Sequence, residues 1–533
     1  MGIKRFAFLF FGIIPMILGL AGCERDITPP VVTEPFVRLL KDQTFQSNIL
    51  KRSIKFAVLL PKDYDSTSTR YPVVYLLHGM GDNESAWYQY GLISYYVDLN
   101  AAETVPMIYV MPQGFNSYWV NKYNGSYPYM DMLVDEMVPE IDYLFRTIKD
   151  PRKRAVMGFS MGGYGALILP AKNPDVFKTG IVLSMSFRTD QQYMNESQDG
   201  WNSQWGTIFG GFGSSGTGRI TDYYKTLSPF HFFSNPGDAS LNGQNYYFDC
   251  GDDEETLSET NNALHVLLRN LNIKHEYRMK NGAHSWDYWH KALPEALKYI
   301  SLAVQNIPYP ADGAPVNTGA SIPTERIVAE KLEGSDLTYI VTLPATYSSG
   351  LSIYPVIIAL HDRNVASQDA ESQAMLSLLN TNMINNKIPA SLIVEIPFQS
   401  VPVNALMLQQ LIAQVQTKYR TIADRNHTIL LGNKQAGGLA YELIPECSAI
   451  INACLLFDAD LPDNAVANKP DLSYYLDISD EGKNYKGYHS LYLSLRQYDL
   501  THEYRVRQGT PSHDSFLLGL NESAGFIKSH LQN

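Results

Sequence analysis

The 533-residue chain is poor in cysteine, in basic residues and in long apolar runs, and each shortage excludes a class of protein. Only 4 cysteines are present, and the three after Cys23 lack metal-ligand spacing, so neither a disulfide framework nor a cysteine metal site is expected. Lys and Arg number 42 against 54 Asp and Glu, a net charge of −12, which argues against a nucleic-acid partner because phosphate binding requires a basic face. After residue 20 no apolar run is long enough to span a bilayer. The 45% apolar content instead predicts two or more packed globular domains.

The N-terminus has the features of a secretory signal. Lys4 and Arg5 precede an apolar run over residues 6–20, which ends in small residues and Cys23. The ending LAGC resembles the bacterial lipoprotein box, which implies a signal peptide over residues 1–22 and a lipidated Cys23. The Pro- and Thr-rich stretch that follows predicts a tether over residues 23–38. We therefore expect a membrane-anchored protein of the cell envelope, on the periplasmic or surface face of the outer membrane.

Four internal sequence matches, which occur in the same order in both halves, indicate that the chain contains two copies of one domain. Residues 71–78 (YPVVYLLH) recur as 354–361 (YPVIIALH), 146–148 (RTI) as 420–422, 246–249 (YYFD) as 474–477 (YYLD), and 275–278 (HEYR) as 502–505. A Pro- and Gly-rich stretch between the two copies marks a junction. The sequence predicts a first domain over 39–306, a linker over 307–319 and a second domain over 320–533.

Short apolar runs alternate with amphipathic stretches in the first copy. The runs at 73–77, 107–111, 155–157, 180–183 and 246–249 are typical of buried parallel strands, and 130–144 and 261–270 of helices. This alternation predicts an α/β fold in which helices flank a mostly parallel sheet.

The motif GFSMGG at residues 158–163 marks a candidate nucleophile. It follows an apolar strand and opens a helix, and its glycines allow the sharp turn that would expose the hydroxyl of Ser160. The backbone N–H of Met161 would then stabilise an oxyanion, together with that of Met80 in the glycine-containing loop after an early strand. A turn without catalytic function is the alternative.

A serine nucleophile needs a base and an acid. His284 lies on a loop after the last predicted strand of the first copy, where this order of elements places a base. Four consecutive acidic residues, 252–255, follow the preceding strand and leave the acid ambiguous. Asp249 has a counterpart at Asp477 in the second copy, which indicates a structural role.

These motifs resemble the esterase family that includes feruloyl esterases, acetyl-xylan esterases, S-formylglutathione hydrolase and the mycolyltransferase antigens. The resemblance covers roughly residues 40–305 and implies the α/β-hydrolase fold, with Ser160 as nucleophile and His284 as base. The family usually has Asp three residues after the strand-end glycine, a position that Glu254 occupies here. We select Glu254 as the acid, with Asp253 and Glu255 as alternatives.

Aromatic residues are concentrated at 201–233, a segment without strong helix or strand periodicity. It predicts either a lid that shapes the substrate pocket or a loop that buries its own rings.

The second copy lacks the catalytic residues of the first. Lys434 aligns with the nucleophile, Gly482 with Glu254 and Pro511 with His284. We therefore expect a degenerate, inactive copy of the fold at residues 320–533.

Together these features predict a serine carboxylesterase that forms an acyl-enzyme and needs neither metal nor organic cofactor. From the resemblance, its partner is an acylated oligo- or polysaccharide, with feruloyl or acetyl esters on xylan as the substrate. Two alternatives remain: an acyltransferase to a sugar hydroxyl, and a glycan-binding surface lipoprotein that retains only the esterase shape.

Overall fold

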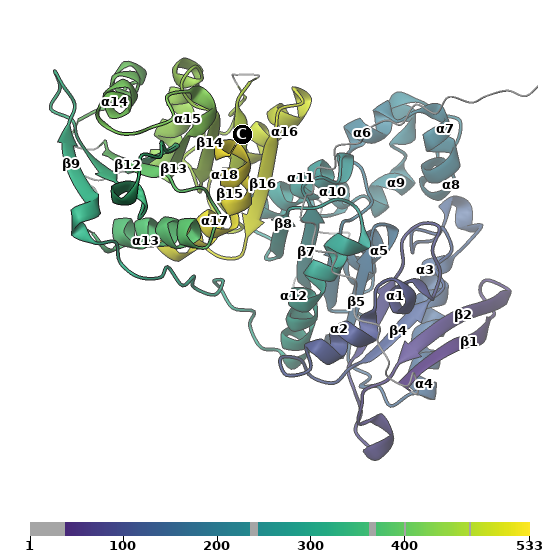
Figure 1. Ribbon diagram of the computed structural model, residues 1–533. Helices are drawn as coiled ribbons and strands as arrows, with labels where there is room; N and C mark the ends of the chain where they lie inside the picture. Colours follow the sequence, from purple (N-terminus) through teal and green to yellow (C-terminus); the bar gives the residue numbers. More distant parts are fainter. Residues whose placement is uncertain (1–37, 235–242, 362–368, 399–400, 468–470, 533) are drawn as a thin grey trace, which may run out of the picture. The chain divides into compact units, whose positions relative to one another are not determined.

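A mostly parallel sheet forms the N-terminal half of the computed structural model, which describes residues 38–234, 243–361, 369–398, 401–467 and 471–532 (Figure 1). The predictions for the signal peptide, Cys23 and nearly all of the tether lie outside these residues. The strand order is β1-β2-β4-β3-β5-β6-β7-β8, with β1 and β2 antiparallel and β3 to β8 parallel. The strands are β1 (Leu39–Ser47), β2 (Arg52–Leu59), β3 (Val73–Leu77), β4 (Ile108–Pro112), β5 (Arg154–Phe159), β6 (Thr179–Leu183), β7 (Asn245–Gly251) and β8 (Glu276–Lys280).

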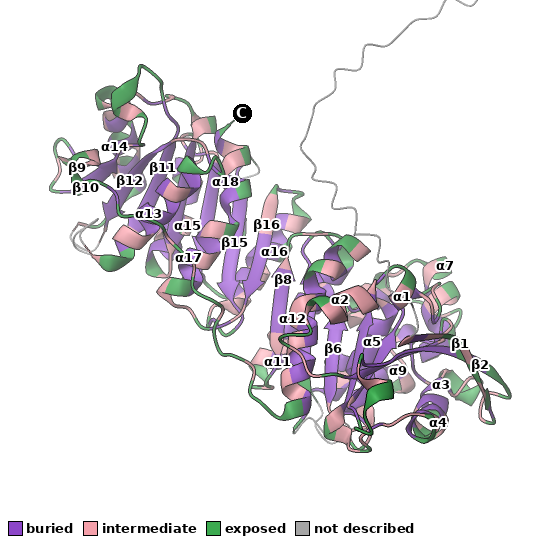
Figure 2. Ribbon diagram, turned by 60° about the horizontal axis from the view of Figure 1, so that its bottom comes forward, coloured by how far each residue is buried: buried purple, intermediate pink, exposed green. Residues whose placement is uncertain are grey.

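Helices cover both faces of this sheet, as β3 illustrates. Its residues Val73, Tyr75 and Leu77 belong to one core cluster, and Val74 and Leu76 to another, because successive side chains of a strand point to opposite faces. The first cluster is completed by α4 (Val138–Leu144), α5 (Met161–Lys172) and α11 (Thr256–Asn270), and the second by α2 (Ile93–Leu99) and α12 (Trp286–Gln305). Figure 2 shows the central parallel strands, such as β6, in the buried colour. Burial on both faces explains why the strands read as continuous apolar runs.

The C-terminal half repeats this strand order. Its order from the far edge is β9-β10-β12-β11-β13-β14-β15-β16, which matches the order of β1 to β8 strand for strand. The strands are β9 (Ile327–Lys331), β10 (Thr338–Thr342), β11 (Val356–His361), β12 (Leu392–Pro397), β13 (Thr428–Asn433), β14 (Ala453–Phe457), β15 (Ser473–Ser479) and β16 (His502–Arg507). Its helices are α13 (Ala370–Ile384), α14 (Ala405–Lys418), α15 (Gln435–Cys447), α16 (Tyr485–Gln497), α17 (His513–Glu522) and α18 (Ala524–Leu531).

The two halves share one sheet. Strands β8 and β16 pair antiparallel at Met279 and Val506, and both halves belong to one compact unit. Residues 307–319 between them contain neither helix nor strand. No helix within the described ranges combines the length and apolarity needed to cross a membrane.

One connection differs strongly between the halves. In the N-terminal half, residues 184–244 join β6 to β7, whereas only residues 458–472 join β14 to β15. The longer connection carries short helices, including α6 (Asp190–Asn195), α8 (Gly206–Phe209), α9 (Asp222–Leu227) and α10 (Pro229–Phe232). We call residues 184–234 the insertion. The segment 201–233, for which the sequence shows no strong helix or strand periodicity, therefore contains several short helices.

Candidate active site

Ser160 occupies a strained turn between β5 and α5. Its backbone has φ 57° and ψ −120°, a conformation that costs a non-glycine residue about 1–3 kcal/mol. The turn is held because the Ser160 N–H donates to the Leu183 carbonyl oxygen at 3.0 Å and its own carbonyl accepts from the Ser186 N–H at 2.9 Å. The strand–turn–helix context predicted from GFSMGG is thus present.

The glycines that flank Ser160 are required by close approach of the backbone. A Cβ on Gly158 would lie 2.2 Å from the Gly162 carbonyl oxygen, and one on Gly162 would lie 2.1 Å from the Leu77 carbonyl oxygen. Any side chain at either position would separate α5 from β5 or β3. The motif therefore encodes the tight packing of this turn as well as its sharpness.

His284 and Glu254 are joined by a hydrogen bond. His284 Nδ1 lies 2.8 Å from Glu254 Oε2, with the carboxylate fully buried and the imidazole 34% exposed. Because a carboxylate oxygen accepts the hydrogen bond at Nδ1, that nitrogen carries the proton. The other ring nitrogen, Nε2, is then free to act as the base. This is the arrangement that a general base requires.

Both oxygens of Glu254 are held in place. Oε1 accepts from the Gly251 N–H at 2.8 Å and from the Ser184 hydroxyl at 2.5 Å. The Ser184 Oγ in turn accepts from the indole N–H of Trp289 at 2.8 Å. The carboxylate is therefore fixed before any substrate binds.

The structure shows which of the acidic residues after β7 contacts His284. Glu254 contacts His284, whereas Asp253 and Glu255 are exposed. Asp249 accepts from Tyr247 Oη at 2.9 Å and pairs with Lys280 at 3.0 Å, in keeping with the structural role expected for it.

Ser160, Glu254 and His284 lie at the same edge of the sheet. They follow β5, β7 and β8, and parallel strands present their carboxyl ends at one edge. Phe159 packs against Trp289 with ring centroids 4.4 Å apart, and Trp289 packs edge-on against His284 at 5.0 Å. Among the described residues no hydrogen bond joins the Ser160 hydroxyl to His284, so their catalytic pairing belongs to the proposal below.

The loop after β3 lies against the nucleophile turn. A Cβ on Gly79 would lie 2.7 Å from the Phe159 ring and 3.4 Å from Ser160 Cβ, so only glycine allows this approach. The loop brings the backbone of Met80, the predicted oxyanion donor, toward the same turn as Met161.

His78 links the backbone of this loop to that of Gly114, a contact that the sequence did not reveal. Its Nε2 accepts from the Gly114 N–H at 2.8 Å, and its Nδ1 therefore donates to the Gly79 carbonyl oxygen at 2.7 Å. Burial lowers the pKa of His78 to about 4, which keeps the ring neutral near pH 7. The only sequence signal was its place in the motif before Gly79.

Replacing Gly79 by alanine is expected to lower kcat for ester hydrolysis about 100-fold with a smaller change in KM, because a displaced loop misplaces an oxyanion donor. Steady-state kinetics on a soluble ester measures this. The control is Gly525→Ala, since a Cβ at that exposed helical position meets nothing within 4 Å. Equal kcat values for the two variants would contradict a catalytic role for this loop.

The insertion buries most of its aromatic rings. Trp201, Trp205, Phe209 and Tyr224 are buried, whereas Phe212 is 65% exposed. The rings pack against one another and against α5, for example Trp205 on Phe209 with centroids 5.9 Å apart. Of the two interpretations of this segment, the structure favours self-burial.

The insertion nevertheless reaches the site through Tyr118. The Tyr118 hydroxyl contacts Gln204 of the insertion, lies 3.4 Å from Ser186 Oγ and donates to the Met80 sulfur at 4.0 Å. These polar groups therefore lie beside the predicted oxyanion loop.

The C-terminal half retains the turn without its nucleophile. Lys434, aligned with Ser160, has φ 53° and ψ −124°, and its N–H donates to the Phe457 carbonyl oxygen at 2.9 Å, as Ser160 does to Leu183. A lysine here offers no hydroxyl or thiol. Inactivity of this half stays a prediction.

Residues 47–300 match the family described as putative esterase. This match agrees with the family that the sequence motifs resemble, and the strand order and turn of the segment are those of the α/β-hydrolase fold. No cluster of three or more metal-ligating side chains occurs in the part of the chain that the structure describes.

Several named proteins are similar to this chain. An endo-1,4-beta-xylanase/feruloyl esterase of Xylanibacter ruminicola is 31% identical over 172 residues, 29% of this chain and 24% of that protein. An acetyl esterase of Caldicellulosiruptor saccharolyticus is 26% identical over 272 residues, 48% of this chain and 96% of that protein. A solved ferulic acid esterase is 26% identical, with a TM-score of 0.41 and coverage of 50% of this chain and 98% of its own. This chain spans only 24% of the length of the xylanase/feruloyl esterase and 28% of the length of two similar esterases of Mycobacterium tuberculosis.

Proposed function

We propose that the N-terminal half is a serine carboxylesterase with Ser160, His284 and Glu254 as its catalytic triad. The observation that carries this is the 2.8 Å hydrogen bond from His284 Nδ1 to the buried Glu254, at the edge where the Ser160 turn lies. The esterase-family match over residues 47–300 supports the same reaction class.

The proposed reaction proceeds through an acyl-enzyme. His284 Nε2 takes the proton of the Ser160 hydroxyl while Ser160 Oγ attacks the carbonyl carbon of the ester. The backbone N–H groups of Met161 and Met80 stabilise the resulting oxyanion. The imidazolium, stabilised by Glu254, then protonates the leaving alcohol. A water deprotonated by His284 attacks the acyl carbonyl, releasing the acid and restoring Ser160.

The substrate that we propose is a feruloyl or acetyl ester on plant polysaccharide such as xylan. The names of the xylanase/feruloyl esterase and the acetyl esterase support these two acyl groups. The polar contacts around Tyr118 and the exposed Met80 provide a surface of mixed polarity near the turn for such an acyl group.

We further propose that Cys23 is lipidated and anchors the protein in the cell envelope, as its LAGC context predicts. The proposal expects incorporation of labelled palmitate into the wild-type chain and none into Cys23→Ala. Equal labelling of the two chains would contradict it.

The test of the substrate is release of ferulate or acetate from methyl ferulate, p-nitrophenyl acetate and feruloylated or acetylated xylan. We expect hydrolysis of at least one ester class and greater kcat/KM on the polysaccharide ester than on the small ester of the same acid. Acyl transfer to added sugar in preference to water would favour an acyltransferase. Absence of turnover on all of them would contradict the esterase.

A further inference from the structure

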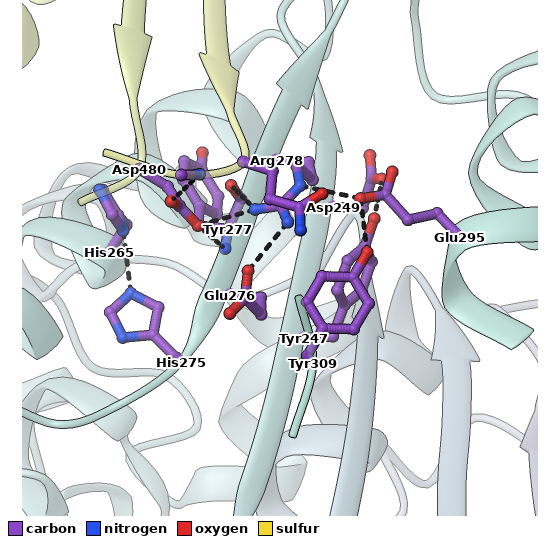
Figure 3. Close-up of polar contacts among 12 residues, drawn as sticks. Tyr247, Asp249, His265, His275, Glu276, Tyr277, Arg278, Glu295, Tyr309 and Asp480 are labelled. Atoms are coloured by element: carbon purple, nitrogen blue, oxygen red, sulfur yellow. Dashed lines mark hydrogen bonds and ion pairs between the residues drawn. The ribbon is translucent and has the colours of Figure 1, made fainter. Parts of the chain in front are cut away.

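Two ion pairs related by the internal repeat join the halves. Arg505 Nη1 of β16 lies 2.5 Å from Asp252 Oδ2, and Arg278 Nη1 of β8 lies 2.7 Å from Asp480 Oδ2. The repeat aligns Asp252 with Asp480 and Arg278 with Arg505, so each half offers the same pair of residues to the other. Figure 3 shows the Arg278–Asp480 pair where the C-terminal half meets β8. All four side chains are buried, and each arginine also pairs with carboxylates of its own half: Arg278 with Glu276 and Glu295, and Arg505 with Glu503.

Asp252 also joins the two loops of the proposed triad. Its Oδ1 accepts from the Gly282 N–H at 3.2 Å, and its own N–H donates to the Lys280 carbonyl oxygen at 3.1 Å. The next residue continues the contact, because the Asp253 N–H donates to the Gly282 carbonyl oxygen at 3.1 Å. Asp252 thus ties the loop of Glu254, two residues later in the chain, to the loop of His284, two residues after Gly282.

The C-terminal half holds this same segment at further points. The Tyr504 N–H donates to Asp252 Oδ2 at 3.1 Å, beside Arg505. The Tyr492 hydroxyl of α16 lies 2.7 Å from Ser258 Oγ, and Arg496 Nε lies 2.7 Å from Glu259 Oε1. The contacts from β16 and α16 therefore span residues 252–259, on both sides of Glu254.

We infer that Arg505 is a positioning residue for catalysis, which holds Asp252 and through it fixes Glu254 against His284. The inference rests on the proposed function and assigns a role to the C-terminal half: it supports the acid–base pair of the other half. Arg505 touches neither substrate nor reacting atoms, so its effect acts through the geometry of the two loops.

The second ion pair, between Arg278 and Asp480, supplies a matched control. Asp480 also accepts from a backbone N–H of the opposite strand, that of Tyr277, at 3.3 Å, and from the Gly509 N–H at 3.0 Å. Yet the residues aligned with Glu254 and His284 are Gly482 and Pro511, so neither aligned position carries an acid or a base. Loss of this pair weakens the same interface without releasing the Glu254 loop.

The test compares Arg505→Gln with Asp480→Asn in the full chain. For Arg505→Gln we expect kcat to fall about 10- to 100-fold with KM changed less than about threefold, because a displaced acid–base pair slows chemistry more than binding. Asp480→Asn is expected to keep kcat within about threefold of wild type. Arg505→Lys, which keeps a cation near Asp252, is expected to restore part of the lost kcat.

Three results would overturn the inference: wild-type kcat in Arg505→Gln, equal losses in Arg505→Gln and Asp480→Asn, or a fall confined to KM. If Arg505→Gln does not fold, Asp252→Asn decides, because it removes the same ion pair from the other side, and wild-type kcat in that variant counts against the inference. Failure of the proposed function is distinguishable, because the wild-type chain would then show no hydrolysis that depends on Ser160.

Discussion

Replacing Ser160 by alanine is expected to lower kcat for ester hydrolysis by about 10⁴-fold or more while KM changes little. The hydroxyl is the proposed attacking group, and alanine removes it without adding bulk. The turn itself is set by the glycines at 158 and 162 and by the bond from residue 160 to the Leu183 carbonyl oxygen, which alanine retains. Binding of the ester should therefore survive the loss of chemistry.

The matched control for Ser160→Ala is Lys434→Ala. It places the same residue in the same backbone conformation, at φ 53° and ψ −124°, in the half that lacks an aligned acid and base. We expect wild-type kcat from this variant. Steady-state kinetics with p-nitrophenyl acetate measures both, and Ser160→Ala retaining more than a tenth of the activity would contradict the assignment.

Replacing Glu254 by glutamine is expected to lower kcat by about 10³- to 10⁴-fold. The amide keeps the shape of the carboxylate but cannot stabilise an imidazolium, and its N–H₂ group turned toward Nδ1 favours the wrong tautomer. The Glu254 carboxylate is fully buried, so solvent does not compensate for the loss of its charge. Thermal stability of the variant should be measured beside kcat to exclude unfolding.

Neighbouring acids provide the controls for Glu254→Gln. Asp253→Asn and Glu255→Gln remove the same charge from exposed side chains that do not contact His284. Both variants are expected to keep kcat within about threefold of wild type, since exposed charges are screened by solvent. A larger loss in either of them than in Glu254→Gln would move the role of the acid to that residue.

The sequence predicted the central strands and the nucleophile turn closely. The run at 73–77 is β3 to the residue, and the run at 155–157 lies within β5. Strands buried on both faces produce an unmistakable apolar run, and the turn needs glycines at fixed offsets. Both features are local, so one segment of sequence carries the whole signal.

The acid could not be settled from the residues themselves. Four consecutive carboxylates follow β7, and which of them faces His284 depends on the turn that precedes α11, where Glu255 has φ 50°. The segment before this turn is held by backbone bonds from Asp252 and Asp253 to the loop at Gly282, nearly thirty residues later. Tertiary contacts therefore decide which carboxylate faces His284, and from the sequence only the family resemblance pointed to Glu254.

The helices of the insertion could not be predicted from the sequence, for a different physical reason. Its helices are 3 to 6 residues long and are stabilised by packed rings such as Trp205 on Phe209, with centroids 5.9 Å apart, rather than by an amphipathic repeat. A periodicity search detects long helices with one apolar face. The support of Asp252 by Arg505 was equally invisible, because it joins residues 253 positions apart.

The most direct test of the central claim is labelling of the wild-type chain with a fluorophosphonate, followed by mass spectrometry of its peptides. The reagent forms a stable ester with a serine that an adjacent base has activated. We expect one equivalent of label on Ser160, complete loss of esterase activity with labelling, and no label on residues 320–533. An active protein that carries its label on another residue, or on none, would contradict the account.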